Sequence, residues 1–367
     1  MKFRIEKTPL VKALTHIAGV IEQRTTIPIL GCVKIATDGQ AINLAGTDTD
    51  MIVSMDLAAD VVEPGSIAVP AAALGDFVKR LPDGSQIEIA VDAGRMTLRC
   101  GRSRFAMGTM EARDFPVFSP PTDSASFSML ARDLLAMLDS VAFAMSTETT
   151  RRYLNGVCLD TTETMLRATA TDGHQLARST IAIPEGAERV PRILVGTKMV
   201  NVLRRHLDCD DEAHITIGTE KMAVTVGGTS IISKLVDMSF PDADRVIPSE
   251  NSHFMDINRD DMRGAVSRVG SVSDAGGRAI SLRFGGHSVH LTASGSAAAE
   301  VEEDVDLASP ATSEFALSVN GRYLANILAT VDTEMVRIAL ESALHPLLIT
   351  GIDSKRDALF VLMPMRG

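Results

Sequence analysis

The sequence predicts an α+β fold made of three repeated domains, each with two helices packed on antiparallel sheets. Phe3, Phe127 and Phe254 each begin a short strand-like stretch that is followed by the apolar spacing of an amphipathic helix. Short motifs recur about 125 residues apart, well beyond the roughly 20–50 residues of solenoid repeats. Each repeat also has a second helical stretch in its latter half. Whole domains are therefore repeated.

The recurring motifs align the repeats and indicate where they divide. The aligned motifs are Thr47-Asp48 with Thr171-Asp172, Leu30-Gly31 with Asn155-Gly156, and Phe115-Pro116 with Phe240-Pro241 and Met363-Pro364. Polar segments that contain proline lie near Pro120–Asp123 and Pro248–Asn251. We expect domains at residues 1–121, 122–250 and 251–367. Accidental similarity among generic α+β segments is the alternative, and the shared offset of several motifs disfavours it.

Capping residues mark the expected helix starts. The first helix begins at an N-cap and first-turn pair, Thr8-Pro9. The second helices follow a proline or a capping side chain: Pro70 before residues 71–81, Thr197 before Lys198–Leu207, and Ser318 or Asn320 before Tyr323–Val331.

Alternating apolar residues predict the strands that surround these helices. Two of the clearest are Gln86–Val91 and Ala213–Ile217. Glycine-containing dipeptides and tripeptides predict hairpin turns at Asp38-Gly39, Asp83-Gly84 and Asp92-Ala93-Gly94.

The composition excludes several classes of protein. The chain has 367 residues, 45% of them hydrophobic, which is enough for folded domains with aliphatic cores. No apolar run is long enough for a signal peptide or a membrane span, so we expect a cytoplasmic protein without a membrane partner. The four cysteines lie far apart, which disfavours a zinc site or a disulfide framework. A net charge of −11 argues against tight nucleic-acid binding unless the cations gather on one surface.

Several motifs together resemble the bacterial DNA polymerase III beta subunits, which are DNA sliding clamps. They span the chain: Thr26–Gly31, Ala45–Asp48, Gly101–Phe105, Tyr153–Gly156, Ala170–His174, Ser233–Asp237, Phe240–Asp242 and Val361–Arg366. The resemblance implies a head-to-tail homodimeric ring whose helices line a central hole. It implies a processivity factor without catalytic activity or cofactor. Its partners would be duplex DNA, the polymerase III alpha subunit, the clamp loader and other proteins with clamp-binding motifs.

The charge on the expected helices is suited to a hole through which DNA passes. The six helical windows together carry a small positive charge, although the whole chain is acidic. Contacts with phosphates would be independent of sequence and would permit sliding. Ordinary solvated helix faces are the alternative. By resemblance, the residues expected to touch DNA are Arg24, Arg152, Tyr153, Lys198, Arg204 and Arg205.

Opposite charges on two expected strands indicate where protomers would meet. Glu300, Glu302, Asp304 and Asp306 alternate along one strand, so they share a face. The first domain carries the basic counterpart, and the resemblance places the ring's seam between these same two domains: Arg95, Arg99, Arg102 and Arg104, with Phe105 beside them. A solvated edge strand guarded by charge against aggregation is the alternative.

The resemblance also implies a hydrophobic pocket between the second and third domains that accepts short peptide segments of partner proteins. Exposed methionine and leucine form adaptable apolar surfaces, and arginine can hold a carboxylate. The residues carried over to this chain are Leu154, Thr171, Gly173, His174, Leu176, Pro241, Arg245, Val246, Asn320, Tyr323, Leu344, Val361, Met363, Pro364, Met365 and Arg366. Gly276-Gly277 and His345-Pro346 depart from the family pattern near this pocket.

Other functions have weaker support in the sequence. His174 beside Asp172 lacks a nucleophile, and His206, Asp208, Cys209, Asp210 and His214 match no ordered metal-ligand spacing. Asp48-Thr49-Asp50 is more typical of an acidic turn than of a magnesium site. The alternatives to a clamp are an enzyme of DNA or nucleotide metabolism and a protein-interaction scaffold that does not bind DNA.

Overall fold

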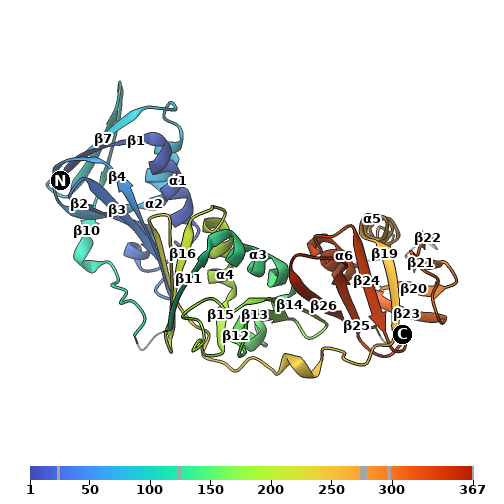
Figure 1. Cartoon of the computed structure of the whole chain (residues 1–367). Coiled ribbons are helices and arrows are strands. Elements are labelled where there is room, and N and C mark those ends of the chain that lie inside the picture. Colours follow the sequence, from blue (N-terminus) through green and yellow to red (C-terminus); the bar gives the residue numbers. More distant parts are fainter. Residues whose placement is uncertain (23–24, 123–124, 273–278, 296–298, 366–367) are drawn as a thin grey trace. The chain divides into compact units, whose positions relative to one another are not determined.

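The computed structural model confirms the α+β fold (Figure 1). It describes residues 1–22, 25–122, 125–272, 279–295 and 299–365. Within these ranges each repeat contributes two α-helices: α1 (Lys7–Ala18) and α2 (Ala71–Lys79), α3 (Ala131–Val141) and α4 (Thr197–His206), and α5 (Arg259–Val269) and α6 (Gly321–Thr330). None of the described helices is long and apolar enough to cross a membrane.

The chain divides into two compact units, and the first contains two sheets. This unit holds residues 1–135, 184–187 and 201–235. One sheet has the order β5-β1-β7-β8-β9: β5 (Asp60–Glu63), β1 (Lys2–Glu6), β7 (Gln86–Asp92), β8 (Arg95–Cys100) and β9 (Ser103–Gly108). The other has the order β10-β6-β2-β3-β4-β18-β17-β16-β11: β10 (Met110–Glu111), β6 (Ser66–Pro70), β2 (Cys32–Asp38), β3 (Ala41–Thr47), β4 (Met51–Ala58), β18 (Thr229–Lys234), β17 (Lys221–Val226), β16 (Glu212–Ile217) and β11 (Ala125–Leu130).

The second unit also contains two sheets. It holds residues 136–183, 188–200 and 236–367. Its larger sheet has the order β15-β12-β13-β14-β26-β25-β24-β19: β15 (Ile193–Gly196), β12 (Gly156–Thr161), β13 (Met165–Thr171), β14 (Gln175–Ala182), β26 (Asp357–Leu362), β25 (Leu347–Gly351), β24 (Met335–Leu340) and β19 (His253–Asn258). Its smaller sheet has the order β22-β21-β20-β23: β22 (Glu300–Asp306), β21 (Ser288–Ser294), β20 (Ala279–Gly285) and β23 (Phe315–Asn320).

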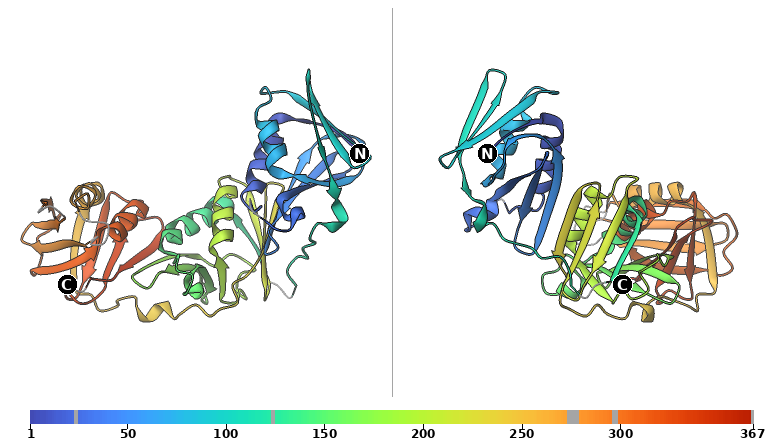
Figure 2. Two further views of the ribbon diagram at one scale, coloured as in Figure 1. Left: turned by 180° about the vertical axis from the view of Figure 1, so that it is seen from behind. Right: turned by 60° about the vertical axis from the view of Figure 1, so that its left-hand side comes forward.

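In the first and third repeats the two helices pack together and bury their apolar faces against the sheets. Helix α1 lies against α2 and contacts β3 and β4, as two views show (Figures 1 and 2). Leu10, Ile17, Leu74 and Val78 on these two helices are completely buried. Helices α5 and α6 form the corresponding pair in the third repeat. The apolar spacing that predicted the helices is therefore the spacing of the core.

Strand pairing joins each repeat to the next. In the first unit β4 pairs with β18, so a strand of the first repeat continues into the sheet of the second. In the second unit β14 pairs with β26, which joins the second repeat to the third in the same manner. The two compact units consequently divide the second repeat between them, because continuous sheets cross the boundaries of the repeats.

Two turns confirm the repeat in atomic detail. The Thr47 hydroxyl donates to the Met51 carbonyl at 2.7 Å, and the Asp48 carboxylate accepts from the Met51 backbone N–H at 2.7 Å. The second repeat has the same bonds. Its Thr171 hydroxyl donates to the Gln175 carbonyl at 2.6 Å, and Asp172 accepts from the Gln175 N–H at 3.0 Å. The Thr-Asp motif was therefore a signal for one type of turn.

The predicted capping residues have mixed outcomes. Asn320 caps α6, since its side chain accepts from the N–H groups of Arg322 and Tyr323. Thr8 as the N-cap of α1 was wrong, because β1 runs directly into a helix that begins at Lys7. Thr197 as a cap was also wrong, because β15 leads straight into α4 and the buried Thr197 hydroxyl has no hydrogen-bond partner.

The strands over 86–91 and 213–217 were predicted correctly, and two of the three predicted hairpins are present. Gly39 joins β2 to β3, and Ala93-Gly94 joins β7 to β8 with positive φ at both residues. Asp83-Gly84 as a hairpin was wrong, because this turn joins α2 to β7. Asp83 instead pairs with the Lys7 ammonium at 2.7 Å.

Candidate functional site

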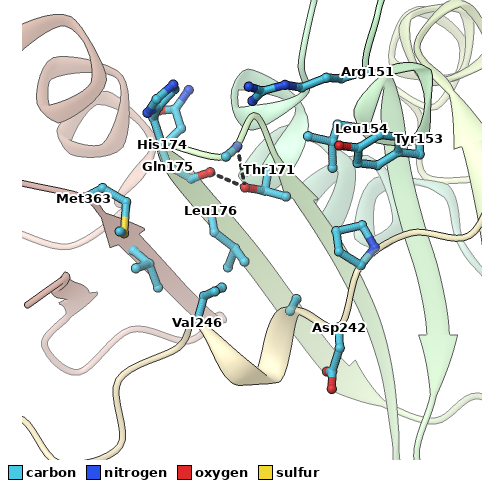
Figure 3. Close-up of a pocket in the computed structure, with 14 residues that line it drawn as sticks. Arg151, Tyr153, Leu154, Thr171, His174, Gln175, Leu176, Asp242, Val246 and Met363 are labelled. Atoms are coloured by element: carbon cyan, nitrogen blue, oxygen red, sulfur yellow. Dashed lines mark hydrogen bonds between the residues drawn. The ribbon is translucent and has the colours of Figure 1, made fainter.

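The second compact unit contains a pocket of about 290 Å³ whose wall is mostly apolar (Figure 3). Three segments supply its lining: residues 151–154, residues 171–176 and residues 241–246, with two further residues from β26 and the segment after it. The lining residues are Arg151, Tyr153, Leu154, Thr171, Gly173, His174, Gln175, Leu176, Pro241, Asp242, Ala243, Val246, Val361 and Met363.

The floor of the pocket is the face of the larger sheet where β14 meets β26. Leu176 is paired with Val361 across this junction and with Thr171 on β13. Residues that are directly opposite in neighbouring strands lie on the same face. Leu154, Leu176, Ala243 and Val361 belong to one buried apolar cluster, so the floor is continuous with the core.

The turn after β13 forms one rim. Gly173 has a φ of 92°, a backbone conformation that favours glycine, and its N–H donates to the Thr171 hydroxyl at 3.1 Å. The His174 carbonyl accepts from the Met363 N–H at 2.9 Å, which fixes the segment after β26 to this turn. The His174 ring stacks on Tyr323 of α6 with ring centroids 6.5 Å apart.

The structure brings nine of the carried-over pocket residues into this lining. They are Leu154, Thr171, Gly173, His174, Leu176, Pro241, Val246, Val361 and Met363. Val246 and Met363 are 48% and 40% exposed, which is unusual for apolar side chains and leaves a surface for a ligand.

Of the seven other carried-over residues, the structure describes six, and none of these six is in the lining. Asn320 caps α6, Leu344 is 83% exposed in the turn before β25, and Arg245 pairs with Asp242 at 3.1 Å. Tyr323 stacks on His174, and Pro364 and Met365 follow the lining residue Met363. Arg366 lies outside the described residues, as does Gly276-Gly277.

Sequence reasoning missed Arg151, Gln175, Asp242 and Ala243 as lining residues, and assigned Tyr153 to DNA instead. Tyr153, Gln175 and Asp242 are adjacent in sequence to predicted pocket residues, and Arg151 and Ala243 lie within three residues of one, so proximity in sequence was the available signal. Gln175 is buried, and its side-chain amide donates to the Asp172 carboxylate at 3.0 Å.

The residues predicted to touch DNA occupy two places. Lys198, Arg204 and Arg205 are exposed on α4, and Arg152 begins the short 3-10 helix that continues to Leu154. Arg24 lies outside the described residues.

Some cations of the other helices are neutralised locally. Lys7 is 7% exposed and donates to the Leu81 carbonyl and to Asp83. Although Lys7 adds to the positive charge of the first helical window, its ammonium faces the α2–β7 turn and not an exposed face of the helix. Arg268 of α5 forms a bidentate pair with Glu303. Helix α4 is therefore the most basic of the six described helices.

The predicted seam residues lie on, or directly beside, two strands that end their sheets. Strand β9 carries Arg104 and Phe105 at the end of its sheet, beside Arg95 and Arg99 on β8, and Arg102 lies in the turn between them. Strand β22 ends the smaller sheet and exposes Glu300, Glu302, Asp304 and Asp306 at alternate positions, as the sequence predicted. Both strands therefore present unpaired backbone groups next to charges of opposite sign.

The alternative sites have structural explanations. Asp48 and Asp172 hold their turns through backbone N–H groups. The His206 ring packs on His16 with centroids 4.4 Å apart, and burial lowers the pKa of both imidazoles. Among the described residues no group of three or more histidine, cysteine or acidic side chains is arranged to hold a metal ion.

In comparison with known proteins, the chain matches one family along its length. DNA polymerase III beta subunit domains match in order: the N-terminal domain over residues 1–119, the central domain over 129–242 and the C-terminal domain over 244–366. The beta sliding clamp of Caulobacter vibrioides is 34% identical over 378 residues, and that of Escherichia coli is 31% identical over 368, with 100% of both chains covered each time.

Solved structures agree with these matches. The sliding clamp of Pseudomonas aeruginosa bound to griselimycin has 33% identity and a TM-score of 0.96, with 100% of both chains covered. The clamp of Bartonella birtlesii bound to griselimycin has 32% identity and a TM-score of 0.95 over the same coverage.

Proposed function

Because the chain belongs to the DNA polymerase III beta subunit family, we propose that two copies close into a ring that encircles duplex DNA and tethers the replicative polymerase to it. The chain is a DNA sliding clamp, a processivity factor that has no catalytic reaction of its own. We assign its three domains to residues 1–121, 122–250 and 251–367, and its place of action to the cytoplasm. Tethering raises the local concentration of the polymerase at its template, so no chemistry is required of the clamp.

One observation carries the proposed ring. Strand pairing already joins the first repeat to the second and the second to the third. Among the described residues, the two strands that would make a third junction, β22 and β9, each pair with a neighbour on one side only. Strands β4, β14 and β22 are equivalent in the three repeats, as are β18, β26 and β9. A junction of β22 with β9 of the partner subunit therefore continues the pattern. Since each protomer has one of each edge, two copies can close.

The repeat also indicates the register of this junction. Met51, Gln175 and Ala299 are equivalent, because the backbone carbonyl of each accepts from the N–H of the residue that directly follows the preceding strand. Met51 pairs with Ser233, and Gln175 pairs with Leu362. Met107 has the place in β9 that Ser233 has in β18, since each lies four residues after the first paired residue of its hairpin.

Placing Met107 opposite Ala299 of the partner subunit brings Arg104 opposite Glu302 and Phe105 opposite Val301. The guanidinium and carboxylate then lie together on the exposed face. The two apolar side chains meet on the other face, where Phe105 already stacks on Phe77 with centroids 4.5 Å apart. Opposite-charge and aromatic pairs across strands each stabilise a sheet.

For contact with the duplex, we propose Arg24, Arg152, Tyr153 and the three cations of α4, Lys198, Arg204 and Arg205.

For partner proteins we propose the pocket on the larger sheet of the second unit, which would accept a short apolar segment of the polymerase alpha subunit, the clamp loader or another clamp-binding protein. Arg245, Asn320, Tyr323, Leu344, Pro364, Met365 and Arg366 would extend this surface beyond the described lining. Griselimycin, which is bound in two relatives, serves as a probe of the pocket.

The enclosure of DNA is tested by comparing the retention of the protein on circular and on linear DNA. The protein is loaded onto nicked circular duplex DNA by a bacterial clamp loader, and gel filtration measures the bound fraction before and after the circle is cut by a restriction enzyme. We expect most of the protein to remain on the circle and to leave after cutting, because an enclosing ring slides off a free end. Equal retention on circular and linear DNA would contradict a ring and would favour an ordinary DNA-binding protein.

The pocket is tested by blocking its entrance. Val246→Arg puts a long charged side chain at a half-exposed position, so the fold should persist while the apolar floor is obstructed. We expect isothermal titration with griselimycin to show at least about a tenfold loss of affinity, as expected when a charge must be desolvated at an apolar contact. Leu344→Arg, at an exposed position outside the lining, is the control. Unchanged binding to Val246→Arg would place the compound elsewhere.

The seam is tested by charge reversal. Arg104→Glu puts two carboxylates opposite each other at both junctions, so sedimentation velocity should show a dimer dissociation constant raised by about tenfold or more. Combining Arg104→Glu with Glu302→Arg in one chain restores an opposite pair and should recover the dimer. Arg189→Glu, at another exposed arginine, is the control. A single variant that remains as dimeric as the wild type would refute the proposed register.

A further inference from the structure

The segment that follows the second repeat forms one wall of the pocket, and Phe240 and Ile247 anchor its two ends in the apolar cluster beneath it. Residues 240–247 cross the face of the larger sheet and include the short 3-10 helix η5 (Ala243–Arg245). Phe240 and Ala243 are buried, whereas Pro241, Asp242 and Val246 are exposed. Ala243 buries only one methyl group, so apolar packing alone gives η5 little to fix its position.

A row of polar side chains lies directly beside the pocket floor, on the same face of the sheet. Arg178 follows Leu176 by two residues on β14, so the two side chains share that face. Thr169 is the cross-strand partner of Arg178, and Arg167 lies two residues before Thr169 on β13. Asp160 on β12 is the partner of Arg167. The apolar floor therefore gives way to a charged strip under η5.

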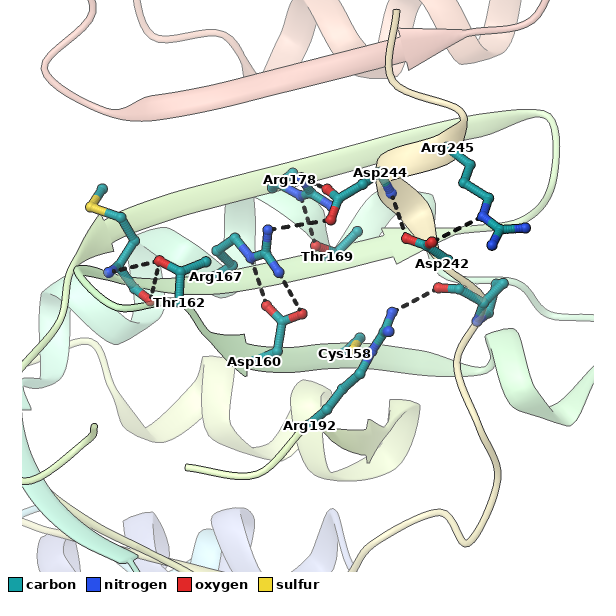
Figure 4. Close-up of polar contacts among 12 residues, drawn as sticks. Cys158, Asp160, Thr162, Arg167, Thr169, Arg178, Arg192, Asp242, Asp244 and Arg245 are labelled. Atoms are coloured by element: carbon teal, nitrogen blue, oxygen red, sulfur yellow. Dashed lines mark hydrogen bonds and ion pairs between the residues drawn. The ribbon is translucent and has the colours of Figure 1, made fainter. Parts of the chain in front are cut away.

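Asp244 of η5 reaches down to this strip (Figure 4). The Arg178 Nη1 donates to Asp244 at 2.5 Å, and Arg167 lies 3.6 Å from the other oxygen of the same carboxylate. Arg178 also donates to the Thr169 hydroxyl at 3.2 Å, and Asp160 holds Arg167 through two hydrogen bonds of 2.8 and 2.9 Å. Four charged side chains from three strands and η5 are thus joined in one network.

Separating Arg178 from Asp244 would cost free energy. Arg178 is only 9% exposed, and Asp244 is the only counterion described for it. A buried guanidinium that lost this carboxylate would retain only a neutral hydroxyl as acceptor, which is costly. The hydrogen bond from Arg178 holds the pKa of the Asp244 carboxyl below its usual value, so this carboxylate is ionised at neutral pH.

From this geometry we propose that the Arg178–Asp244 pair, supported by Arg167, positions the 240–247 wall and so sets the affinity of the pocket for apolar peptide ligands. This inference rests on the proposed function of the pocket. Neither Arg178 nor Asp244 lines the pocket, and therefore both are positioning residues. They act through Pro241, Asp242, Ala243 and Val246, which do line it.

The test compares Asp244→Asn with the wild-type full-length protein. Asparagine keeps the size of the side chain and removes the charge that Arg178 and Arg167 require. We expect griselimycin to bind about tenfold more weakly by isothermal titration, a typical effect of a residue that acts on a site without touching the ligand. We also expect faster hydrogen exchange in residues 240–247, and Asp244→Glu, which keeps the charge, should recover most of the affinity.

The matched control is Asp256→Asn. Asp256 forms a bidentate pair with Arg337, with two hydrogen bonds of 2.7 Å, between neighbouring strands of the same sheet. This control removes a comparable pair that does not touch the 240–247 segment, so binding should stay within about twofold of wild type, the usual independence of separated sites. Thermal unfolding of every variant reports the general loss of stability.

Three results would overturn the inference. They are wild-type affinity of Asp244→Asn, an equal loss in Asp256→Asn, or unchanged hydrogen exchange in residues 240–247. If the wild type itself does not bind griselimycin, the proposed pocket function fails. The exchange measurement then still decides whether the pair positions the segment.

Discussion

Pairing between strand edges is the interaction on which the rest of this structure depends. An unpaired edge presents backbone donors and acceptors that readily pair with another strand. The first and second repeats each cover one such edge with the last strand of the following repeat, at β4–β18 and β14–β26. Backbone hydrogen bonds make these junctions regardless of side-chain identity. A shared fold can therefore be joined in the same manner by sequences that differ.

The same junction that joins the second and third repeats makes the floor of the pocket. Leu176 and Val361 face each other across β14 and β26, and both are buried in one apolar cluster. The connection to the third repeat must then cross this sheet to reach β19, and on its way it forms the 240–247 wall. A binding surface thus arises at the boundary of two repeats, with the network of Arg178 and Asp244 holding the crossing segment in place.

The sequence predicted what local patterns determine. The strand-to-helix openings, the six helices and the alternating acidic strand were all correct, because each depends on periodicity within one element. The caps at Thr8 and Thr197 failed because α1 begins at Lys7 and α4 begins at Thr197, so both threonines lie inside the first turn and not before it. The ion pair between Lys7 and Asp83 was not predicted, since the two residues are far apart in the sequence. The pair Arg178–Asp244 could not be predicted, because it depends on a segment far away in the sequence crossing strand β14, which local residue patterns do not encode.

Covalent closure of the proposed junctions gives the most direct test of enclosure. Arg104→Cys and Glu302→Cys in one chain place two thiols opposite each other at each junction, where a short bifunctional thiol reagent can join them. The protein is loaded on nicked circular DNA, cross-linked and then denatured in detergent. The proposed ring predicts that protein remains on the circle after denaturation and is released only when the DNA is cut. Complete release by detergent from DNA that carries efficiently cross-linked protein would contradict the claim that the duplex passes through a closed ring.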